Sequence, residues 1–270
     1  MFFKNFFRND KAKHLIKLPL NDLNKAIDTN RRLLNTIDTW VDMDAFNNSC
    51  FEYGVPDFIR IDLDKDIGMD MTYSDCMLTI ANKHFDKTKY LEIGVSVGKN
   101  FYQMFNGLED GEVTGFDIEE IYPVIEKRLN FMESDEWITM PGSIKKNRSS
   151  FKKFTYKDKP VNYISADVWD ENSWSKLQGN KFNLVFSDAL HSAEAILFEF
   201  EMLTKYSLLD DKFVIVWDDL VGEMETAFYD IIKKYNYKYS IKDKYLLKIN
   251  GWVGQHEEKH SVGIISNFKI

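Results

Sequence analysis

The chain has 270 residues, of which 44% are hydrophobic and 15% aromatic. This composition excludes a disordered chain and supplies enough apolar surface for one large domain, or for a domain with an appendage. The formal net charge of −8 argues against a protein that wraps nucleic acid over its whole surface.

The sequence also indicates where the protein resides and in which redox state its cysteines are. No apolar run is long enough to cross a bilayer. The N-terminal residues 1–8 are apolar but interrupted by Lys4 and Arg8, and they are too short for a secretory signal. We expect them to form a docking segment, which invites self-association as a homo-oligomer.

Cys50 and Cys76 could pair, but reduced thiols are the simpler interpretation. We therefore expect a cytoplasmic protein with no membrane or nucleic-acid partner.

The sequence predicts a helical appendage over residues 1–70 and the main domain over residues 71–270. Apolar residues recur at helical spacing over 20–46. Glycine, proline and a run of aspartates make 50–72 irregular. The appendage would serve as a lid over the active site, as a dimer contact or only as packing. A further helix begins near Thr72 and leads into the first strand.

Residues 89–100 predict a short apolar strand, a glycine turn and a helix. Gly94 and Gly98 can take backbone angles barred to other residues and let a ligand approach the main chain. The pattern is not the nicotinamide fingerprint, because Ser96 stands where a middle glycine could be. It is not a phosphate-binding P-loop either, because no Ser or Thr follows Lys99.

The E-x-G-x-x-x-G spacing resembles the first motif of class I S-adenosylmethionine-dependent methyltransferases. In that family the acid and the glycines cradle the amino acid end of the cofactor. The resemblance implies that Glu92, Gly94, Ser96 and Gly98 bind S-adenosylmethionine. The alternative is an ordinary strand-to-helix turn of a nucleotide-fold protein.

From Tyr90 onward apolar strands alternate with helices, which predicts a parallel sheet with helices on both faces. Further strands are expected over 112–117, 161–167, 182–186, 213–217, 237–241 and 262–266. The helices between them are expected over 118–135, 171–178, 192–206 and 221–235. The fold class is therefore α/β: a Rossmann-like, doubly wound, seven-stranded sheet whose last strand is antiparallel, with the N-terminal helical appendage.

Acids and aromatic residues near the strand ends are candidate cofactor contacts. Asp117 ends the second strand, and in such folds that acid accepts hydrogen bonds from ribose hydroxyls; Glu119 is the second candidate. Asp167 ends the third strand and resembles the methyltransferase acid that meets the adenine amino group. Trp169 could cover the adenine ring, and Tyr73 could face the cofactor or the substrate.

The stretch 141–160 is the one basic island in an acidic chain. It would receive an anionic substrate group, such as the diphosphate of a nucleotide sugar, or it is a solvated surface insertion. Its basic residues are Lys145, Lys146, Arg148, Lys152, Lys153, Lys157 and Lys159.

Three carboxylates follow two neighbouring strands of the predicted sheet. Asp188 comes after the fourth strand, and Asp218 and Asp219 come after the fifth. Ligands of open α/β sheets lie beyond the carboxyl ends of the strands, and adjacent strands are only about 5 Å apart. The three carboxylates would repel one another unless a hard cation joined them. Mg²⁺ suits such oxygen ligands, and Mn²⁺ or Ca²⁺ are alternatives.

His191 lies three residues after Asp188, at the mouth of the same loop. Imidazole has an ordinary pKa of about 6.5, so it can take a proton near neutral pH. A hydroxyl group bound to the metal is acidified, and His191 could complete its deprotonation. His191 and Asp188 are therefore the candidate catalytic residues.

The Asp188–His191 pair and the Asp218–Asp219 pair resemble the metal-dependent O-methyltransferases of the catechol, caffeoyl-CoA and sugar types. The catechol type has an Asp-Asn pair and a lysine base. Here the second pair is Asp-Asp and the base position is His191, which is the pattern of the sugar-modifying branch. Two departures are Ser96 in the first motif and the missing glycine before Asp167.

This resemblance covers residues 72–270. It implies an enzyme that transfers a methyl group from S-adenosylmethionine to a hydroxyl of a sugar, a sugar nucleotide or a related small molecule. Mg²⁺ (or Mn²⁺) would be bound by Asp188, Asp218 and Asp219. The alternatives are a metal-independent methyltransferase acting on nitrogen or oxygen, and a nucleotide-binding module without catalysis.

A zinc-protease signature, H-E-x-x-H, occurs at residues 256–260. It needs a helix that brings both imidazoles to one face, but Gly251 and Gly254 precede it and a strand-like segment follows. We therefore expect a loop there, in which Trp252 and His256 could touch the methyl acceptor.

Overall fold

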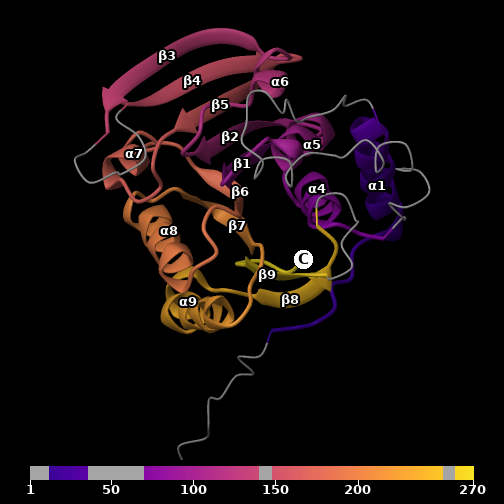
Figure 1. Cartoon of the computed structure of the whole chain (residues 1–270). Coiled ribbons are helices and arrows are strands. Elements are labelled where there is room, and N and C mark those ends of the chain that lie inside the picture. The colour runs from indigo at the N-terminus through magenta and orange to yellow at the C-terminus, as the bar shows by residue number, and fades with distance from the viewer. Residues whose placement is uncertain (1–11, 36–69, 140–147, 252–258) are drawn as a thin grey trace, which may run out of the picture.

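The structure is a computed structural model that describes residues 12–35, 70–139, 148–251 and 259–270. Within these ranges the strands form one nine-stranded sheet (Figure 1) in the order β3-β4-β5-β2-β1-β6-β7-β9-β8. The strands are β1 Thr88–Ile93, β2 Gly111–Asp117, β3 Asn130–Ile138, β4 Arg148–Tyr156, β5 Lys159–Ser165, β6 Phe182–Ser187, β7 Leu209–Trp217, β8 Asp243–Ile249 and β9 His260–Ser266. The helices are α1 Leu20–Asn35, α4 Tyr73–His84, α5 Lys99–Gly107, α6 Pro123–Glu126, α7 Glu171–Ser175, α8 Ala193–Lys205 and α9 Glu223–Tyr239.

The centre of the sheet is parallel, as expected for a Rossmann-like α/β fold. β5, β2, β1, β6 and β7 run in the same direction, and β9 is antiparallel to both β7 and β8. The prediction of an antiparallel last strand is confirmed. The predicted number of seven strands is wrong, because β3 and β4 add an antiparallel pair at the β5 edge.

The helix expected over 118–135 is also wrong, because that stretch holds only the short helix α6 and the start of β3. Its apolar residues Ile121 and Ile125 are buried, so the helical spacing reflected real core positions. The switch to a strand comes from pairing with β4, where Lys153 lies 2.7 Å from Glu133. Such a cross-strand ion pair depends on a partner some twenty positions away, which local periodicity cannot reveal.

The strand expected over 237–241 is wrong as well. Residues up to Tyr239 continue helix α9, and the corresponding strand is β8, which begins later. The reason is that one face of the helix packs on α8. The ring centroids of Tyr235 and Tyr239 lie 4.7 Å and 6.2 Å from the ring centroid of Phe200. Residues four apart share a helix face, so these tyrosines favour the helix over a strand.

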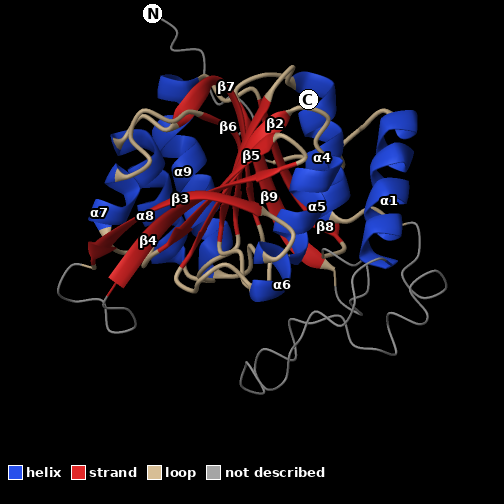
Figure 2. Cartoon of the chain, turned by 90° about the horizontal axis from the view of Figure 1, so that it is seen from above, coloured by secondary structure: helices blue, strands red, loops and turns tan. Residues whose placement is uncertain are grey.

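Side chains alternate between the two faces of the sheet, and each face is covered by helices. On β6, Leu184 and Phe186 belong to the core that α4 and α5 cover. Val185 points the other way, into the core formed with α8 and α9. Figure 2 shows α4 and α5 on one side of the strands, with α1 outside them, and α7, α8 and α9 on the other. This two-sided burial explains apolar runs such as residues 213–217 of β7.

The N-terminal part of the described chain is tied to the main sheet. Lys13 donates its main-chain N–H to Lys244 and accepts from Leu246, both at 2.9 Å, so it pairs with the edge strand β8. Helix α1 ends at Asn35. The remainder of the helix expected over 20–46 lies outside the described residues, and the domain boundary at residue 70 stays a prediction.

Among the described helices, none is both long and apolar enough to cross a membrane. Cys76 is buried in α4, and burial raises the pKa of its thiol to about 12. Cys50 and the docking segment 1–8 lie outside the described residues.

Candidate functional site

The loops that follow β1, β6 and β7 are held side by side at one edge of the sheet. The main-chain N–H of Gly94 donates to Phe116 on β2 at 2.8 Å, and that of Asp188 donates to Ile93 on β1 at 2.8 Å. The N–H of Asp218 donates to the last residue of β6 at 3.1 Å. The parallel ladder thus continues one residue beyond the strands, which places Asp188 and Asp218 on adjacent strand tips.

Gly94 is required where the turn after β1 meets the loop after β6. It has a φ of +84°, and a Cβ atom there would lie 2.4 Å from Cα and 2.5 Å from N of Ala189. No real Cβ tolerates such distances to backbone atoms, so any side chain would push the two loops apart. The glycine that the motif predicted therefore has a packing role next to Asp188.

Asp117 holds the same turn from the end of β2. Its Oδ2 accepts the main-chain N–H groups of Val95 at 2.6 Å and Ser96 at 2.8 Å. Its Oδ1 accepts the N–H of Glu119 at 2.9 Å. Ser96 has a φ of +51°, a left-handed conformation that glycine adopts more easily. The two hydrogen bonds from Asp117 fix the turn in spite of the serine.

A cavity of about 630 Å³ lies against this turn. Its size falls in the range of small-molecule sites, about 300–1,000 Å³. It is lined by seven of the main predicted site residues and by the second ribose candidate, Glu119: Tyr73, Glu92, Gly94, Ser96, Asp117, Asp188 and His191 are the seven. The cavity therefore brings five of the eight predicted cofactor residues together with the predicted catalytic pair.

Three predicted cofactor residues are not among those that line the cavity. Gly98 precedes α5 with a φ of +76°, and a Cβ there would lie 3.0 Å from the side chain of Ile125. Its contact with the cofactor stays a prediction. Asp167 accepts the main-chain N–H of Trp169 at 2.9 Å. Trp169 is 44% exposed and packs on Phe198 at 5.0 Å between ring centroids. Contacts of Asp167 and Trp169 with an adenine ring stay a prediction.

Glu92 lines the cavity and is only 2% exposed. It accepts hydrogen bonds from the hydroxyl of Tyr90 at 2.7 Å and from the amide of Asn100 at 2.9 Å. Burial raises the pKa of Glu92 well above its ordinary value, and these hydrogen bonds only partly oppose that rise. A buried carboxyl group of this kind is well suited to meet a positively charged ligand group, because the ligand would stabilise its ionised form.

Two histidines link the strand-end carboxylates. His191 Nε2 lies 3.1 Å from Asp188 Oδ1, and His191 Nδ1 lies 3.5 Å from Asp219 Oδ2. His260 Nδ1 lies 2.7 Å from Asp218 Oδ2 and 3.3 Å from Asp219 Oδ1. The five side chains form one continuous cluster from Asp188 to Asp218.

Burial and neighbouring charges shift the proton affinities in this cluster. Burial raises the pKa of Asp188 to about 6, although the hydrogen bond with His191 lowers it. The same hydrogen bond raises the pKa of His191. Burial opposes protonation of His260, but the hydrogen bond with Asp218 and the charges of Asp219 and Asp188 raise its pKa overall. Such shifts are typical of functional sites.

The donor atoms of this cluster fit a divalent cation. One ligand atom each from Asp218, Asp219 and His260 lies within 4.8 Å of the others, the only such trio among the described residues. Carboxylate oxygen and imidazole nitrogen are both common ligands of divalent metals. Asp188, the third predicted ligand, is not in this trio and is joined to it through His191.

His260 is the site residue that sequence reasoning missed. It is the last residue of the H-E-x-x-H pattern, but it begins strand β9, which is not the helix that the protease signature requires. The usable signal was topological: an antiparallel last strand beside β7 must start at the edge where β7 ends, next to Asp218. Trp252 and His256, the candidate acceptor contacts, lie outside the described residues.

None of the described residues of the basic island, 148–160, lines the cavity. Within its described part, Lys152 lies 3.2 Å from both Glu120 and Glu126, and Arg148 lies 4.0 Å from Glu136. These contacts tie β4 to its neighbours through acidic side chains. Lys145 and Lys146 lie outside the described residues.

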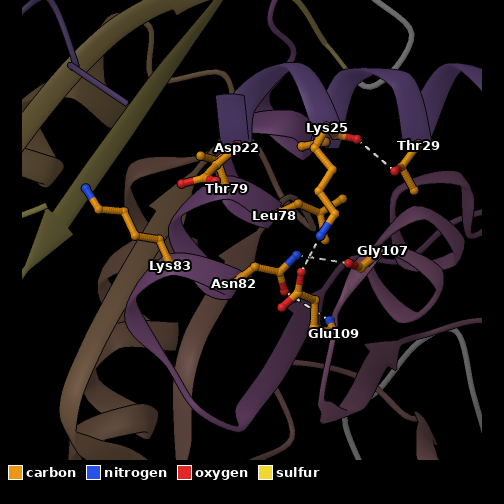
Figure 3. Close-up of a pocket in the computed structure, with 10 residues that line it drawn as sticks. Asp22, Lys25, Thr29, Leu78, Thr79, Asn82, Lys83, Gly107 and Glu109 are labelled. Atoms are coloured by element: carbon orange, nitrogen blue, oxygen red, sulfur yellow. Dashed lines mark hydrogen bonds and ion pairs between the residues drawn. The ribbon is translucent and has the colours of Figure 1, made fainter. Parts of the chain in front are cut away.

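A second cavity, of about 160 Å³, lies between α1, α4 and the end of α5 (Figure 3). Asn82 bridges its floor, donating to the carbonyl of Gly107 at 3.0 Å and accepting the N–H of Glu109 at 3.0 Å. Lys25 on α1 pairs with the Glu109 carboxylate across the opening. No predicted site residue lines this cavity, and its contacts join α1 to the main domain.

No protein-family model matches the chain, and no curated protein matches it. Solved structures that resemble it include an O-methyltransferase from Bacillus cereus in complex with SAH, with 14% identity over 82% of this chain and 92% of that one, at a TM-score of 0.46. Another is the O-methyltransferase TomG from Streptomyces achromogenes in complex with SAM, with 13% identity over 93% and 91% and a TM-score of 0.45. A third is cofactor-bound Rv0187 from MTB, with 13% identity over 72% and 78% and a TM-score of 0.46. These low identities leave the site residues to be judged on their own geometry.

Proposed function

We propose that the chain is an S-adenosylmethionine-dependent, divalent-metal-dependent O-methyltransferase that acts on a hydroxyl of a sugar, a sugar nucleotide or a related small molecule. The observation that carries the proposal is that the glycine turn, Glu92 and the Asp188–His191 pair line the same cavity. A methyl donor bound at the turn would have its reactive end next to the only imidazole among the residues that line this cavity.

The chain's own groups match the parts of the cofactor. Glu92 would meet the ammonium group of the donor's amino acid end, whose charge stabilises the ionised carboxylate. Glu119, exposed on the cavity wall, would accept ribose hydroxyls. Asp117 can share in this, since a carboxylate has about four acceptor positions and the main-chain N–H groups of Val95, Ser96 and Glu119 occupy three.

His191 would move the proton. In the tautomer whose Nε2–H donates to Asp188 Oδ1, at 3.1 Å, Nδ1 is left to accept a proton from the acceptor hydroxyl. The acceptor oxygen then attacks the sulfonium methyl, the carbon–sulfur bond breaks, and its electron pair stays on sulfur as a neutral thioether. Positioning of the two reactants by the cavity supplies much of the rate.

A divalent cation would be held by Asp218 and Asp219, with Asp188 beside them. When bound, such an ion lowers the pKa of the acceptor hydroxyl and so eases its deprotonation. The contribution of the chain is to gather negative charge at two adjacent strand tips and to keep His191 within 3.5 Å of Asp219.

Transfer of a labelled methyl group from S-adenosylmethionine to a panel of sugars, nucleotide sugars and catechols tests the proposal. We expect turnover on a hydroxyl acceptor that EDTA abolishes and added divalent metal restores. His191→Asn should lower kcat by about 10²–10⁴-fold, the usual contribution of a general base. Asp188→Asn should lower it as well, because the imidazole loses its orienting partner.

The competing function is a metal-independent methyltransferase. It is favoured by the Asp188–His191 hydrogen bond, which alone can activate a hydroxyl or amine. Turnover that survives EDTA and Asp218→Asn would support this alternative. Cofactor binding with no turnover on any acceptor would instead support a nucleotide-binding module.

A further inference from the structure

His260 lies against two of the carboxylates assigned to the cation, although the proposed reaction gives it no part. Its Nδ1 lies 2.7 Å from Asp218 Oδ2 and 3.3 Å from Asp219 Oδ1. Two ligand atoms at right angles around one ion, each about 2.1 Å from it, are about 3.0 Å apart. The two distances from His260 lie on either side of this value, and one ligand atom from each of the three side chains lies within 4.8 Å of the others.

The surrounding fold holds the side chain of His260 in place. The side chain is 17% exposed, and its ring meets the ring of Tyr73 edge-on at 6.0 Å between centroids. The next residue, Ser261, accepts the main-chain N–H of Leu220 at 2.8 Å. Leu220 directly follows Asp219, so the two segments that carry the trio are bonded to each other.

We propose that His260 is a nitrogen ligand of the cation, together with Asp218 and Asp219, and that the site therefore selects a first-row transition metal such as Mn²⁺ over Mg²⁺. The proposal rests on the proposed function for the presence of a cation. Mg²⁺ prefers an all-oxygen shell and keeps several waters, whereas imidazole suits transition metals. One nitrogen among carboxylate oxygens thus shifts the preference of the site away from Mg²⁺.

Pulsed electron paramagnetic resonance of Mn²⁺ bound to the full-length chain tests the ligand directly. We expect modulation from a directly coordinated imidazole nitrogen in the wild-type protein. The modulation should disappear in His260→Asn and persist in His191→Asn, the matched variant of the other histidine in the cluster. His260→Gln repeats the test if the Asn variant does not fold.

Metal competition tests the selectivity. His260→Asp makes the ligand set all-oxygen, so the ratio of Mn²⁺ to Mg²⁺ affinity should fall by about tenfold or more. In His191→Asn the ratio should stay near that of the wild type. Thermal melting and titration with S-adenosylhomocysteine on the same samples establish that each variant is folded.

Three results would overturn the proposal: no Mn²⁺ binding by the wild type, nitrogen modulation that survives in the His260 variants, or equal affinity for both metals. These results are separate from a failure of the proposed function. If EDTA inactivates the protein but no nitrogen ligand is detected, the proposed function stands and only the assignment of His260 as a ligand fails. If Mn²⁺ binds through His260 but no methyl group is transferred, the metal site stands and the proposed function fails.

Discussion

Gly94 and Gly179 show how one residue type serves two different needs. Both have a positive φ, +84° and +92°. A Cβ at Gly94 would meet the backbone of Ala189, whereas a Cβ at Gly179 would meet nothing within 4 Å. The two positions therefore separate the cost of a strained backbone from the cost of a steric clash.

Gly94→Ala should abolish or strongly weaken cofactor binding, by more than tenfold in Kd, because it forces the turn after β1 away from the loop that carries Asp188. Gly179→Ala should lower stability by about 1–2 kcal/mol, the usual cost of a left-handed alanine, and leave cofactor binding unchanged. Titration with S-adenosylhomocysteine and urea unfolding measure both. Equal binding by the two variants would show that the contact with Ala189 does not shape the site.

Glu199 is a buried acid on α8 whose hydroxyl partner, Ser187, directly precedes Asp188. Burial raises the pKa of Glu199 to about 8. Because the folded pKa is above the unfolded one, folding is favoured at low pH, and this contribution is lost as the pH rises from about 4.5 through 8.

Glu199→Gln, which keeps the shape and hydrogen-bonding capacity, should therefore be more stable than the wild type at pH 8, by roughly 1–3 kcal/mol. The difference should shrink toward pH 5. Glu201→Gln, at an exposed position of the same helix, is the control and should show no such trend. Unfolding curves at several pH values give the answer, and a pH-independent difference would refute the assignment.

Most of the predicted site follows from residue-scale patterns. The glycine spacing and the acids at strand ends led to Glu92, Gly94, Asp117 and Asp188, which line one cavity. His260 could not be found in this way. Its contact with Asp218 joins residues 42 positions apart, and only the pairing of the last strand brings them together.

At the scale of elements, α1 is joined to α4 by a buried ion pair. Arg31 lies 3.1 Å from Asp75, and their side chains are 8% and 0% exposed. Asp75 also caps the N-terminus of α4 by accepting the N–H of Thr72 at 2.9 Å. That terminus carries Tyr73, which lines the cavity. Helix α1 thus supports the end of α4 that carries this cavity residue.

Arg31→Ala should destabilise the protein by about 3–5 kcal/mol, because it leaves a buried carboxylate without its charged partner. Arg32→Ala is the matched control, since Arg32 is exposed and bonds only within its own helix among the contacts seen here. Its effect should stay within about 0.5 kcal/mol. Urea unfolding distinguishes the two, and a small loss for Arg31 would mean that α1 docks independently of this pair.

Elements were predicted well where the signal was local and poorly where it was not. Residues 213–217 of β7, for example, form a continuous apolar run that both faces of the sheet bury. The β3–β4 pair was missed because its strands are stabilised by each other's charges, as in the contact of Lys153 with Glu133. The boundary of α9 was missed because Tyr239 packs on a residue of another helix.

At the scale of the whole molecule, the topology explains why the site lies where it does. Parallel strands all end at one edge, and the antiparallel β9 begins at that same edge. The edge therefore collects acids from the ends of β6 and β7 and a histidine from the start of β9. Of these residues Asp188 lines the cavity, together with the buried acid Glu92.

Calorimetric titration of the full-length chain with S-adenosylmethionine tests the central claim most directly. The account predicts binding of one molecule per chain, with an affinity that Gly94→Ala reduces by more than tenfold and Gly179→Ala leaves unchanged. No heat of binding at millimolar cofactor, or equal binding by both variants, would contradict it.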